Sequence, residues 1–329
     1  MIERPPPPAR IPDEDEVVGW IQELSNWGRW GPDDGLGTLN FIGDAKRLEA
    51  AQLVSEGICL SLGADIVQGE VADPGLPGPQ RYMLGTGLGL DQPADPGRVT
   101  RFPDRGSAFA IELFALVFHG KSITHLDALS HGFWGDRMYN GLPASSVNEW
   151  GGATRNDVTT ACDGIVSRGV LLDAPAAFGR DWLDPDEPVF PADLEAMEQA
   201  AEVRLGTGDI LLLRTGTTRY RRERRDTWGV HTGHAGYHAT CLPWFAERQL
   251  AAVGMDAAQD VMPSGYPGLT MPIHTVGLVG MGLWLIDNCD LERLSATCAE
   301  LGRWSFQFVL APLRITGGTG SPANPLALL

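Results

Sequence analysis

Short apolar runs and helically spaced apolar residues alternate along the second half of the chain. The runs FALVFHG, GVLLDA, ILLLRTG and AAVGMDA predict buried strands at residues 114–120, 169–174, 210–216 and 251–257. The segments PADLEAMEQAAEVRL and CLPWFAERQL predict helices before the third and fourth of these strands. Strands that alternate with helices indicate an α/β domain.

The N-terminal part is less regular. Residues 1–20 begin with the proline-rich stretch RPPPPARIP, which we interpret as a stiffened arm, and residues 21–329 are expected to form a single domain. The sequence DEDEVVGWIQEL predicts a short amphipathic helix across this boundary. Residues 69–105 are punctuated by proline and glycine, and so long a loop is expected to cover a site or a subunit neighbour.

Composition and charge exclude several classes of partner. The 329 residues carry a formal net charge of -17, which opposes binding to nucleic acid or to an anionic membrane. The dense basic run RRERR at 221–225 is interpreted as a solvated loop. The sequence shows neither a secretory signal nor an apolar segment of membrane-spanning length, so we expect a cytoplasmic protein.

Chemistry-bearing residues concentrate in FHGKSITHLDALSHGFWGDRMYNG, residues 118–141, which hold three of the seven histidines. His125 and Asp127 are two residues apart, so in extended backbone they point to the same side. His119 ends the expected strand, and His131 comes within reach if the chain curls after Asp127. Imidazole and carboxylate ligands together suit zinc or manganese.

The octapeptide THLDALSH resembles the motif H-x-G-T-H-x-D-x-P-x-H of the cyclase family, which includes bacterial kynurenine formamidase and isatin hydrolase; Leu129 stands in place of the proline. The segments WGPDDGLGTLN, GDILLLRTG, MPIHTVGLVGMGLWLIDN and GGTGSPANPL resemble the longer branch of that family. The resemblance implies a swivelling β/β/α domain, with a mixed central β-sheet or barrel-like core flanked by helices. It also implies assembly as a homodimer or homotetramer.

The same resemblance implies a metal site that holds one or two divalent ions. His125 and Asp127 match ligand positions, and His131 matches a position that is either a second-metal ligand or the general base. His274 and Asp287 fall near the downstream pair, where aspartate replaces the more usual glutamate and shortens the reach by one methylene.

Lys121 departs from the family pattern, because it occupies the position of the first histidine, four residues before His125. A protonated ammonium has no lone pair to donate and repels a divalent cation. Two interpretations stay open. Either the turn from Gly120 to Ile123 bulges so that His119 supplies the missing nitrogen, or the site holds metal loosely or not at all.

Aromatic residues and further histidines are candidates for contacts with a substrate. The proposed apolar walls of a pocket are Trp27, Trp30, Trp134 and Tyr139. His238 is interpreted as a helix cap or a substrate contact, whereas His231 and His234 are interpreted as exposed loop histidines.

These features predict an enzyme that acts on a small molecule. The expected reaction is metal-dependent hydrolysis of a carbon–nitrogen bond in a small cyclic amide or N-acyl compound, with His131 as the base that takes a proton from metal-activated water. One alternative is a metal-free lyase or cyclase that uses His131 and Lys121 as its acid–base pair. The other is a catalytically silent, ligand-binding member of the fold.

Overall fold

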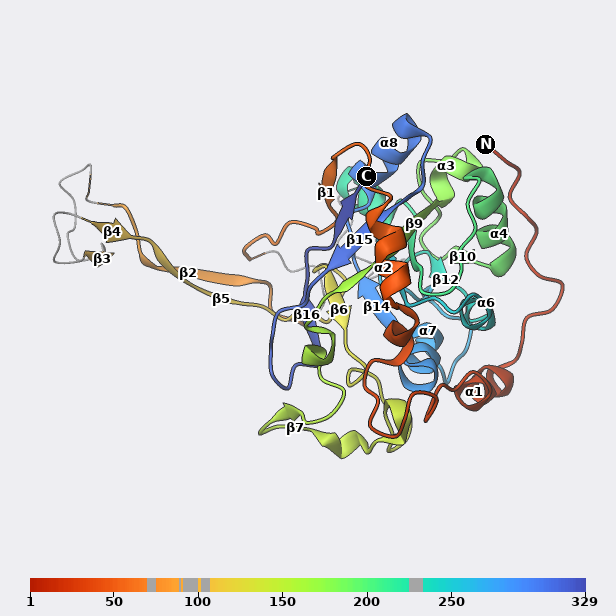
Figure 1. Ribbon diagram of the computed structural model, residues 1–329, viewed down its shortest axis with the longest axis horizontal. Coiled ribbons are helices and arrows are strands. Elements are labelled where there is room, and N and C mark those ends of the chain that lie inside the picture. The colour runs from red at the N-terminus through yellow and green to blue at the C-terminus, as the bar shows by residue number, and fades with distance from the viewer. Residues whose placement is uncertain (70–74, 89, 91–99, 102–106, 225–232) are drawn as a thin grey trace.

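A curled, nine-stranded mixed sheet runs through the centre of the molecule, with helices on its outer faces (Figure 1). The computed structural model describes residues 1–69, 75–88, 90, 100–101, 107–224 and 233–329. The strand order is β1-β17-β15-β9-β11-β13-β14-β6-β16. This arrangement confirms the expected α/β class with a mixed central sheet flanked by helices.

The strands of the central sheet are short. In sheet order they are β1 (Cys59–Ser61), β17 (Leu326–Leu328), β15 (Ser305–Leu310), β9 (Ile165–Asp173), β11 (Ile210–Arg214), β13 (Ala252–Met255), β14 (Trp284–Asp287), β6 (His125–Asp127) and β16 (Gly320–Pro322). The two-stranded pairs are β2 (Gln80–Gly85) with β5 (Ile111–Ala115), β3 (Thr100–Arg101) with β4 (Ala108–Phe109), β7 (Val147–Asn148) with β8 (Gly152–Ala153), and β10 (Pro188–Val189) with β12 (Gly236–Tyr237).

Helices connect and cover these strands. They are α1 (Glu14–Glu23), α2 (Asp44–Ala51), α3 (Ala174–Phe178), α4 (Pro191–Ala200), α5 (Thr217–Arg224), α6 (Cys241–Arg248), α7 (Pro272–His274) and α8 (Glu292–Leu301). Single turns of 3₁₀ helix are η1 (Gly37–Phe41), η3 (Tyr139–Gly141), η4 (Ala144–Ser146) and η5 (Val158–Ala161), and η6 (Thr275–Met281) is a π-helix. None of the helices among the described residues combines the length and the apolar character needed to cross a bilayer.

The core of the sheet follows from its apolar strands. Strands β9, β11, β13 and β14 run parallel to one another. All residues of β11 and β13 are buried, as is typical of parallel strands covered on both faces. The strands predicted at 169–174, 210–216 and 251–257, and the helices predicted before the last two, are therefore confirmed as β9, β11, β13, α4 and α6.

Two predictions from the apolar and basic patterns are wrong. The run 114–120 is not a buried strand, because β5 ends at Ala115 and all its residues are exposed. The stretch 221–224 is not a loop, because it completes α5, in which Arg221 is buried. The last residue of the basic run lies outside the described residues.

The N-terminal segment is attached to the body. Asp13 caps α1 by accepting a hydrogen bond from the Glu16 backbone N–H at 3.0 Å, and this confirms the predicted amphipathic helix. Val17 and Ile21, on either side of the predicted boundary after residue 20, both belong to the core. Nearer the terminus, Arg4 forms an ion pair of 2.8 Å with Asp193 at the start of α4.

Candidate metal centre

Strands β6 and β14 bring three of the predicted ligands together. His125 and Asp127 are the two ends of β6, and Asp287 is the residue directly opposite His125 in the antiparallel pair. Nε2 of His125 lies 3.4 Å from Oδ1 of Asp127 and 3.9 Å from Oδ2 of Asp287. All three side chains are buried. The two-residue spacing therefore places His125 and Asp127 in one group, as the sequence predicted.

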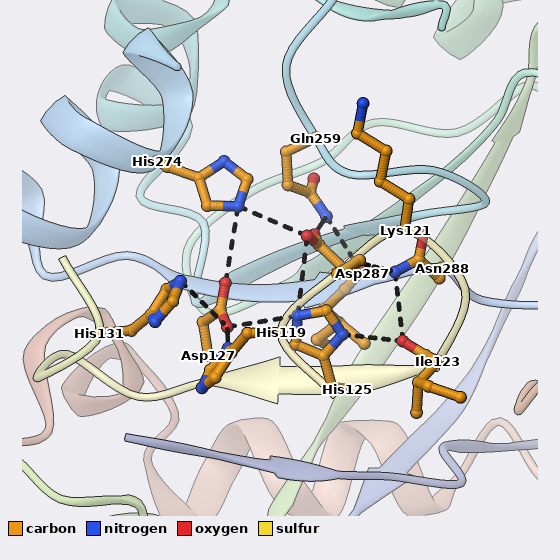
Figure 2. Close-up of polar contacts among 12 residues, drawn as sticks. His119, Lys121, Ile123, His125, Asp127, His131, Gln259, His274, Asp287 and Asn288 are labelled. Atoms are coloured by element: carbon orange, nitrogen blue, oxygen red, sulfur yellow. Dashed lines mark hydrogen bonds and ion pairs between the residues drawn. The ribbon is translucent and has the colours of Figure 1, made fainter. Parts of the chain in front are cut away.

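His119 returns to this group through an irregular turn. Its Nδ1 lies 2.9 Å from Oδ1 of Asp127 (Figure 2). Its Nε2 lies 3.1 Å from Oγ1 of Thr319. The ring stacks on that of His131 with the centroids 3.9 Å apart, and Nε2 of His131 lies 4.0 Å from Oδ1 of Asp127. Lys121 points away from these histidines (Figure 2). This geometry places His119 where the first of the two interpretations requires it, and its role as a ligand stays a prediction.

His274 approaches the two carboxylates from the other side. It is the last residue of α7, and its Nε2 lies 3.6 Å from Oδ2 of Asp127 and 3.4 Å from Oδ2 of Asp287. Figure 2 shows the ring facing Asp127 across the space that His125 and His131 also border. The five expected nitrogen and oxygen ligands and His119 therefore converge on one place.

Outer hydrogen bonds fix the tautomers of two histidines. A carbonyl oxygen only accepts, so Nδ1 of His125 donates to the carbonyl of Ile123 at 2.8 Å. Nδ1 of His274 lies 2.6 Å from Oδ2 of Asp260 and donates to that carboxylate. In each neutral ring Nε2 then carries the lone pair, and it faces the carboxylates of the centre. Metal-ligating histidines are commonly oriented in this way.

The histidines and carboxylates of the cluster shift one another's pKa values. Burial alone would lower the pKa of His125, but the carboxylates of Asp127 and Asp287 outweigh it and raise that pKa to about 9. Burial would likewise raise the pKa of Asp127, yet the neighbouring His131 and His125 hold it well below its usual range. Positive charge is therefore strongly favoured at this place.

A divalent cation fits the residues that are present. Oδ2 of Asp127 is buried and has no hydrogen-bond partner, although four imidazoles surround the carboxylate. There are two groups of three residues in which the possible ligand atoms all lie within 4.8 Å of one another. One group is His119, Asp127 and His131, and the other is His125, Asp127 and Asp287. Asp127 belongs to both groups.

His131 differs from the other histidines of the centre. Burial lowers its pKa to about 4, although the carboxylate of Asp127 acts in the opposite direction. Its side chain keeps 32% of its accessible surface, whereas His125 keeps 3%. A neutral, partly accessible imidazole beside a candidate metal can take a proton from water or substrate.

The five proposed substrate contacts lie outside this cluster. In the described part of the chain, no hydrogen bond or ring contact joins them to its histidines and carboxylates. The Trp27 indole donates to the carbonyl of Val279, and the buried Tyr139 hydroxyl donates to Asp34. Trp30 packs edge-on against Phe41. These three contacts are those of structural residues, and substrate binding stays a prediction.

The other two proposed substrate contacts, His238 and Trp134, and the two loop histidines also lie apart from the cluster or outside the described residues. His238 is buried, and its burial lowers its pKa to about 4. Its ring contacts Thr240 and lies 3.4 Å from the Tyr266 hydroxyl. Trp134 is partly exposed at the surface. His234 is not an exposed loop residue but buried, and burial, with Lys121 and Arg221 nearby, lowers its pKa to about 3. His231 lies outside the described residues.

Asp260 and Gln259 are site residues that the sequence analysis missed. Asp260 receives Nδ1 of His274 and also accepts the Ile273 backbone N–H at 2.6 Å. The Gln259 amide donates to Oδ1 of Asp287 at 2.8 Å. Both follow the carboxyl end of β13, where side chains gather at the edge of a parallel sheet. The sequence signal for their role is their position in AAVGMDAAQD, just after the apolar residues of a predicted strand.

Comparisons with known proteins agree with this architecture. The Cyclase family model matches residues 89–259. A crystal structure described as that of a novel cyclase is 32% identical, covers 93% of this chain and 98% of its own, and superposes with a TM-score of 0.82. A comparison with curated proteins gave no match.

Isatin hydrolases share the fold at lower identity. Isatin hydrolase A from Labrenzia aggregata is 19% identical, with a TM-score of 0.58 over 87% of this chain and 98% of its own. The Ralstonia solanacearum isatin hydrolase A is 21% identical, with a TM-score of 0.57 over 82% of this chain and 91% of its own. From the family match and the 32% identical structure together, the chain belongs to the cyclase family.

Proposed function

We propose that the protein is a metal-dependent hydrolase that cleaves the carbon–nitrogen bond of a small cyclic amide or N-acyl compound. The observation that carries this proposal is the convergence of His119, His125, His274 and Asp287 on the carboxylate of Asp127, whose buried Oδ2 has no hydrogen-bond partner. Isatin is a cyclic amide, and isatin hydrolases share this fold, which supports the class of substrate.

The proposed ligands are His119, His125, Asp127, His274 and Asp287, with zinc or manganese as the ion. When bound, such an ion lowers the pKa of a coordinated water and polarises a carbonyl group. Asp260 and Ile123 hold the imidazoles of His274 and His125 with Nε2 toward the carboxylates of Asp127 and Asp287, so these residues would need little reorganisation to hold an ion.

His131 is proposed as the general base. It is neutral near neutral pH and more exposed than the other histidines of the centre, so it can accept the proton of the attacking water and return it to the leaving nitrogen. Its stacking on His119 holds the ring parallel to a proposed ligand. A second role as ligand to a second ion is compatible with its distance of 4.0 Å from Asp127.

Lys121 weighs against the metal-free alternative. An acid–base pair of His131 and Lys121 needs both groups to reach the same bound substrate, but the Lys121 side chain points away from His131 (Figure 2). The catalytically silent, ligand-binding alternative predicts no turnover, so an activity assay distinguishes it from the hydrolase.

The test is metal analysis of the purified, untagged protein by inductively coupled plasma mass spectrometry, after expression with zinc and manganese available. We expect a near-stoichiometric ion that His125→Ala and Asp127→Ala remove. Lys121→Gln is the matched control in the same turn, and it should retain the ion. Hydrolysis of a panel of cyclic amides and N-formyl compounds should then be lost on chelation and restored by metal.

Absence of bound metal after reconstitution would refute the proposal. Turnover that persists in the chelated protein and is lost in Lys121→Gln would favour the metal-free enzyme instead. Ligand-induced stabilisation without turnover of any compound would favour the silent, ligand-binding member.

A further inference from the structure

The C-terminal segment GGTGSPANPL, to which the sequence assigned no role, forms the strand beside the candidate metal centre. Its strand β16 lies at the edge of the central sheet and pairs with β6, with Gly320 directly opposite Asp127. The Ala128 backbone N–H donates to the carbonyl of Thr319 at 3.0 Å. The backbone of Thr319 and Gly320 is therefore fixed next to the carboxylate on which the candidate ligands converge.

The same two residues hold the ring of His119. The hydroxyl oxygen of Thr319 lies 3.1 Å from Nε2 of His119. A Cβ on residue 320 would come within 2.7 Å of Cε1 of that ring, so glycine leaves the room that the imidazole needs. The His131 ring stacks on it with the centroids 3.9 Å apart, and the centroid of the Phe118 ring lies 4.4 Å away. The ring position is thus defined by packing, and Thr319 supplies the hydrogen bond at Nε2.

The hydrogen bonds of His119 place its proton on the nitrogen that faces the candidate metal centre. A carboxylate oxygen only accepts, so Nδ1–H of His119 donates to Oδ1 of Asp127 at 2.9 Å (Figure 2). In the neutral ring Nε2 then carries the lone pair and accepts from the Thr319 hydroxyl. His125 and His274 differ, because their Nε2 lone pairs already face the carboxylates. His119 therefore needs a change of tautomer before it can bind an ion beside Asp127.

A threonine hydroxyl can serve both tautomers from one position. Its O–H donates to a bare ring nitrogen, and its oxygen accepts from an N–H after rotation about the Cβ–Oγ1 bond. When one proton leaves Nδ1 and one is taken up from water at Nε2, the ring stays neutral and the hydrogen bond to Thr319 reverses its direction. The groups at Nδ1 of His274 and His125, a carboxylate and a carbonyl, only accept and therefore fix one tautomer.

We propose that Thr319 is a positioning residue that lets His119 bind the ion through Nδ1. This inference rests on the proposed function, because it assigns an atom and a partner to one candidate ligand of the same centre. His119 then differs from His125 and His274, which present Nε2. The competing arrangement keeps the proton on Nδ1, so that His119 only orients the carboxylate of Asp127. The possible ligand atoms of His119, Asp127 and His131 lie within 4.8 Å of one another, which favours the former.

The experiment is two-bond ¹H–¹⁵N correlation NMR of the full chain, labelled with ¹⁵N at histidine, without metal and with saturating zinc. Bare, protonated and zinc-bound ring nitrogens differ in their ¹⁵N shifts, and His119→Gln identifies the signals of His119. Without metal we expect a protonated Nδ1 and a bare Nε2. With zinc we expect a protonated Nε2 and a zinc-bound Nδ1.

Variants of Thr319 test its part in this change. Thr319→Val removes the hydroxyl at nearly the same shape, and we expect zinc affinity to fall about 10- to 100-fold in competition with a chelating dye. Thr319→Ser keeps a hydroxyl and should restore most of the affinity. Thr154→Val is the matched control, because the Thr154 hydroxyl donates to the carbonyl of Ser146 at 2.9 Å instead. Circular dichroism verifies that each variant is folded.

The outcomes separate this inference from the proposed function. Zinc that binds while His119 keeps its proton on Nδ1 would overturn the inference and leave the proposed function standing, since the other candidate ligands would still hold the ion. A Thr319→Val variant that binds zinc as tightly as the control would also overturn it. A wild-type chain that takes up no metal would refute the proposed function and this inference with it.

Discussion

At the scale of single residues, Asp260 holds His274 in the tautomer that a metal ligand needs. Its carboxylate accepts a hydrogen bond from Nδ1–H of His274 at 2.6 Å and another from the Ile273 backbone N–H at 2.6 Å. Asp260→Asn keeps an acceptor oxygen but loses the charge that favours the N–H on Nδ1. We expect metal affinity to fall about 10- to 100-fold. Competition with a chelating dye measures this loss.

The matched control for Asp260→Asn is Asp256→Asn, which removes a buried carboxylate from the same segment. Asp256 accepts hydrogen bonds from Thr215 and Gly216 rather than from a histidine of the centre. Equal metal affinity in wild type and Asp260→Asn, with a folded protein, would show that Asp260 does not position His274.

His238 is a residue whose burial makes stability depend on pH. Its Nδ1 accepts the Thr240 backbone N–H at 3.2 Å, and burial lowers its pKa to about 4. Since this pKa lies below that of the unfolded chain, the unfolded state binds the proton more readily as the pH falls through about 6.5. Protonation of this histidine in the unfolded state therefore lowers the free energy of unfolding by about 2 kcal/mol between about pH 7 and pH 5.

The test compares wild type with His238→Asn, whose side-chain oxygen can replace Nδ1 as acceptor but does not titrate. Urea unfolding at both pH values should show a decrease that is about 2 kcal/mol smaller in His238→Asn. An identical decrease in the two proteins would contradict the prediction. Because only the difference is used, the other histidines cancel.

At the scale of elements, the end of η6 sets where β14 begins and therefore where Asp287 lies. Gly282 closes η6 with a φ of 66°, and a Cβ there would come within 2.4 Å of the Tyr139 ring. Gly302 closes α8 with a φ of 61° and has open space around it. The two glycines thus share the backbone strain and differ in packing.

Gly302→Ala should therefore cost about 1 kcal/mol of unfolding free energy, the cost of a left-handed alanine. Gly282→Ala should cost at least about 2 kcal/mol, because the backbone or Tyr139 must move as well. Urea unfolding of both variants measures the difference. Equal losses would mean that the Tyr139 ring yields freely and that packing does not fix this junction.

At the scale of the whole molecule, the candidate metal centre brings together residues from distant parts of the chain. Its side chains come from β6, α7, β14 and the turn before β6, so a bound ion stabilises only the folded state. Zinc at about 100 times its dissociation constant should add about 2.7 kcal/mol. For a chain of this size that corresponds to an increase in Tm of roughly 4 °C.

Differential scanning calorimetry with and without zinc measures this increase, and Asp127→Asn is expected to abolish it. An equal increase in wild type and Asp127→Asn would place the stabilising ion elsewhere on the protein.

Local pattern was sufficient where a side chain's neighbours are set by its own segment. The spacing of His125 and Asp127 puts both on one side of β6 whatever surrounds the strand, and the apolar runs of β9, β11 and β13 form buried parallel strands. Burial of a strand depends on what lies against it, however. The equally apolar run 114–120 was wrongly predicted to be buried, because β5 pairs only with β2 in a two-stranded ribbon that projects from the body (Figure 1).

The sequence by itself determined the α/β class, the family resemblance and the cluster of candidate ligands between His119 and His131. Only the tertiary structure decided that His119 returns to Asp127 while Lys121 points away, and that Asp260 and Gln259 support the centre. The physical reason is distance along the chain. Periodicity fixes which side of an element a residue faces, whereas contacts between β6, α7 and the end of β13 exist only once the sheet has assembled.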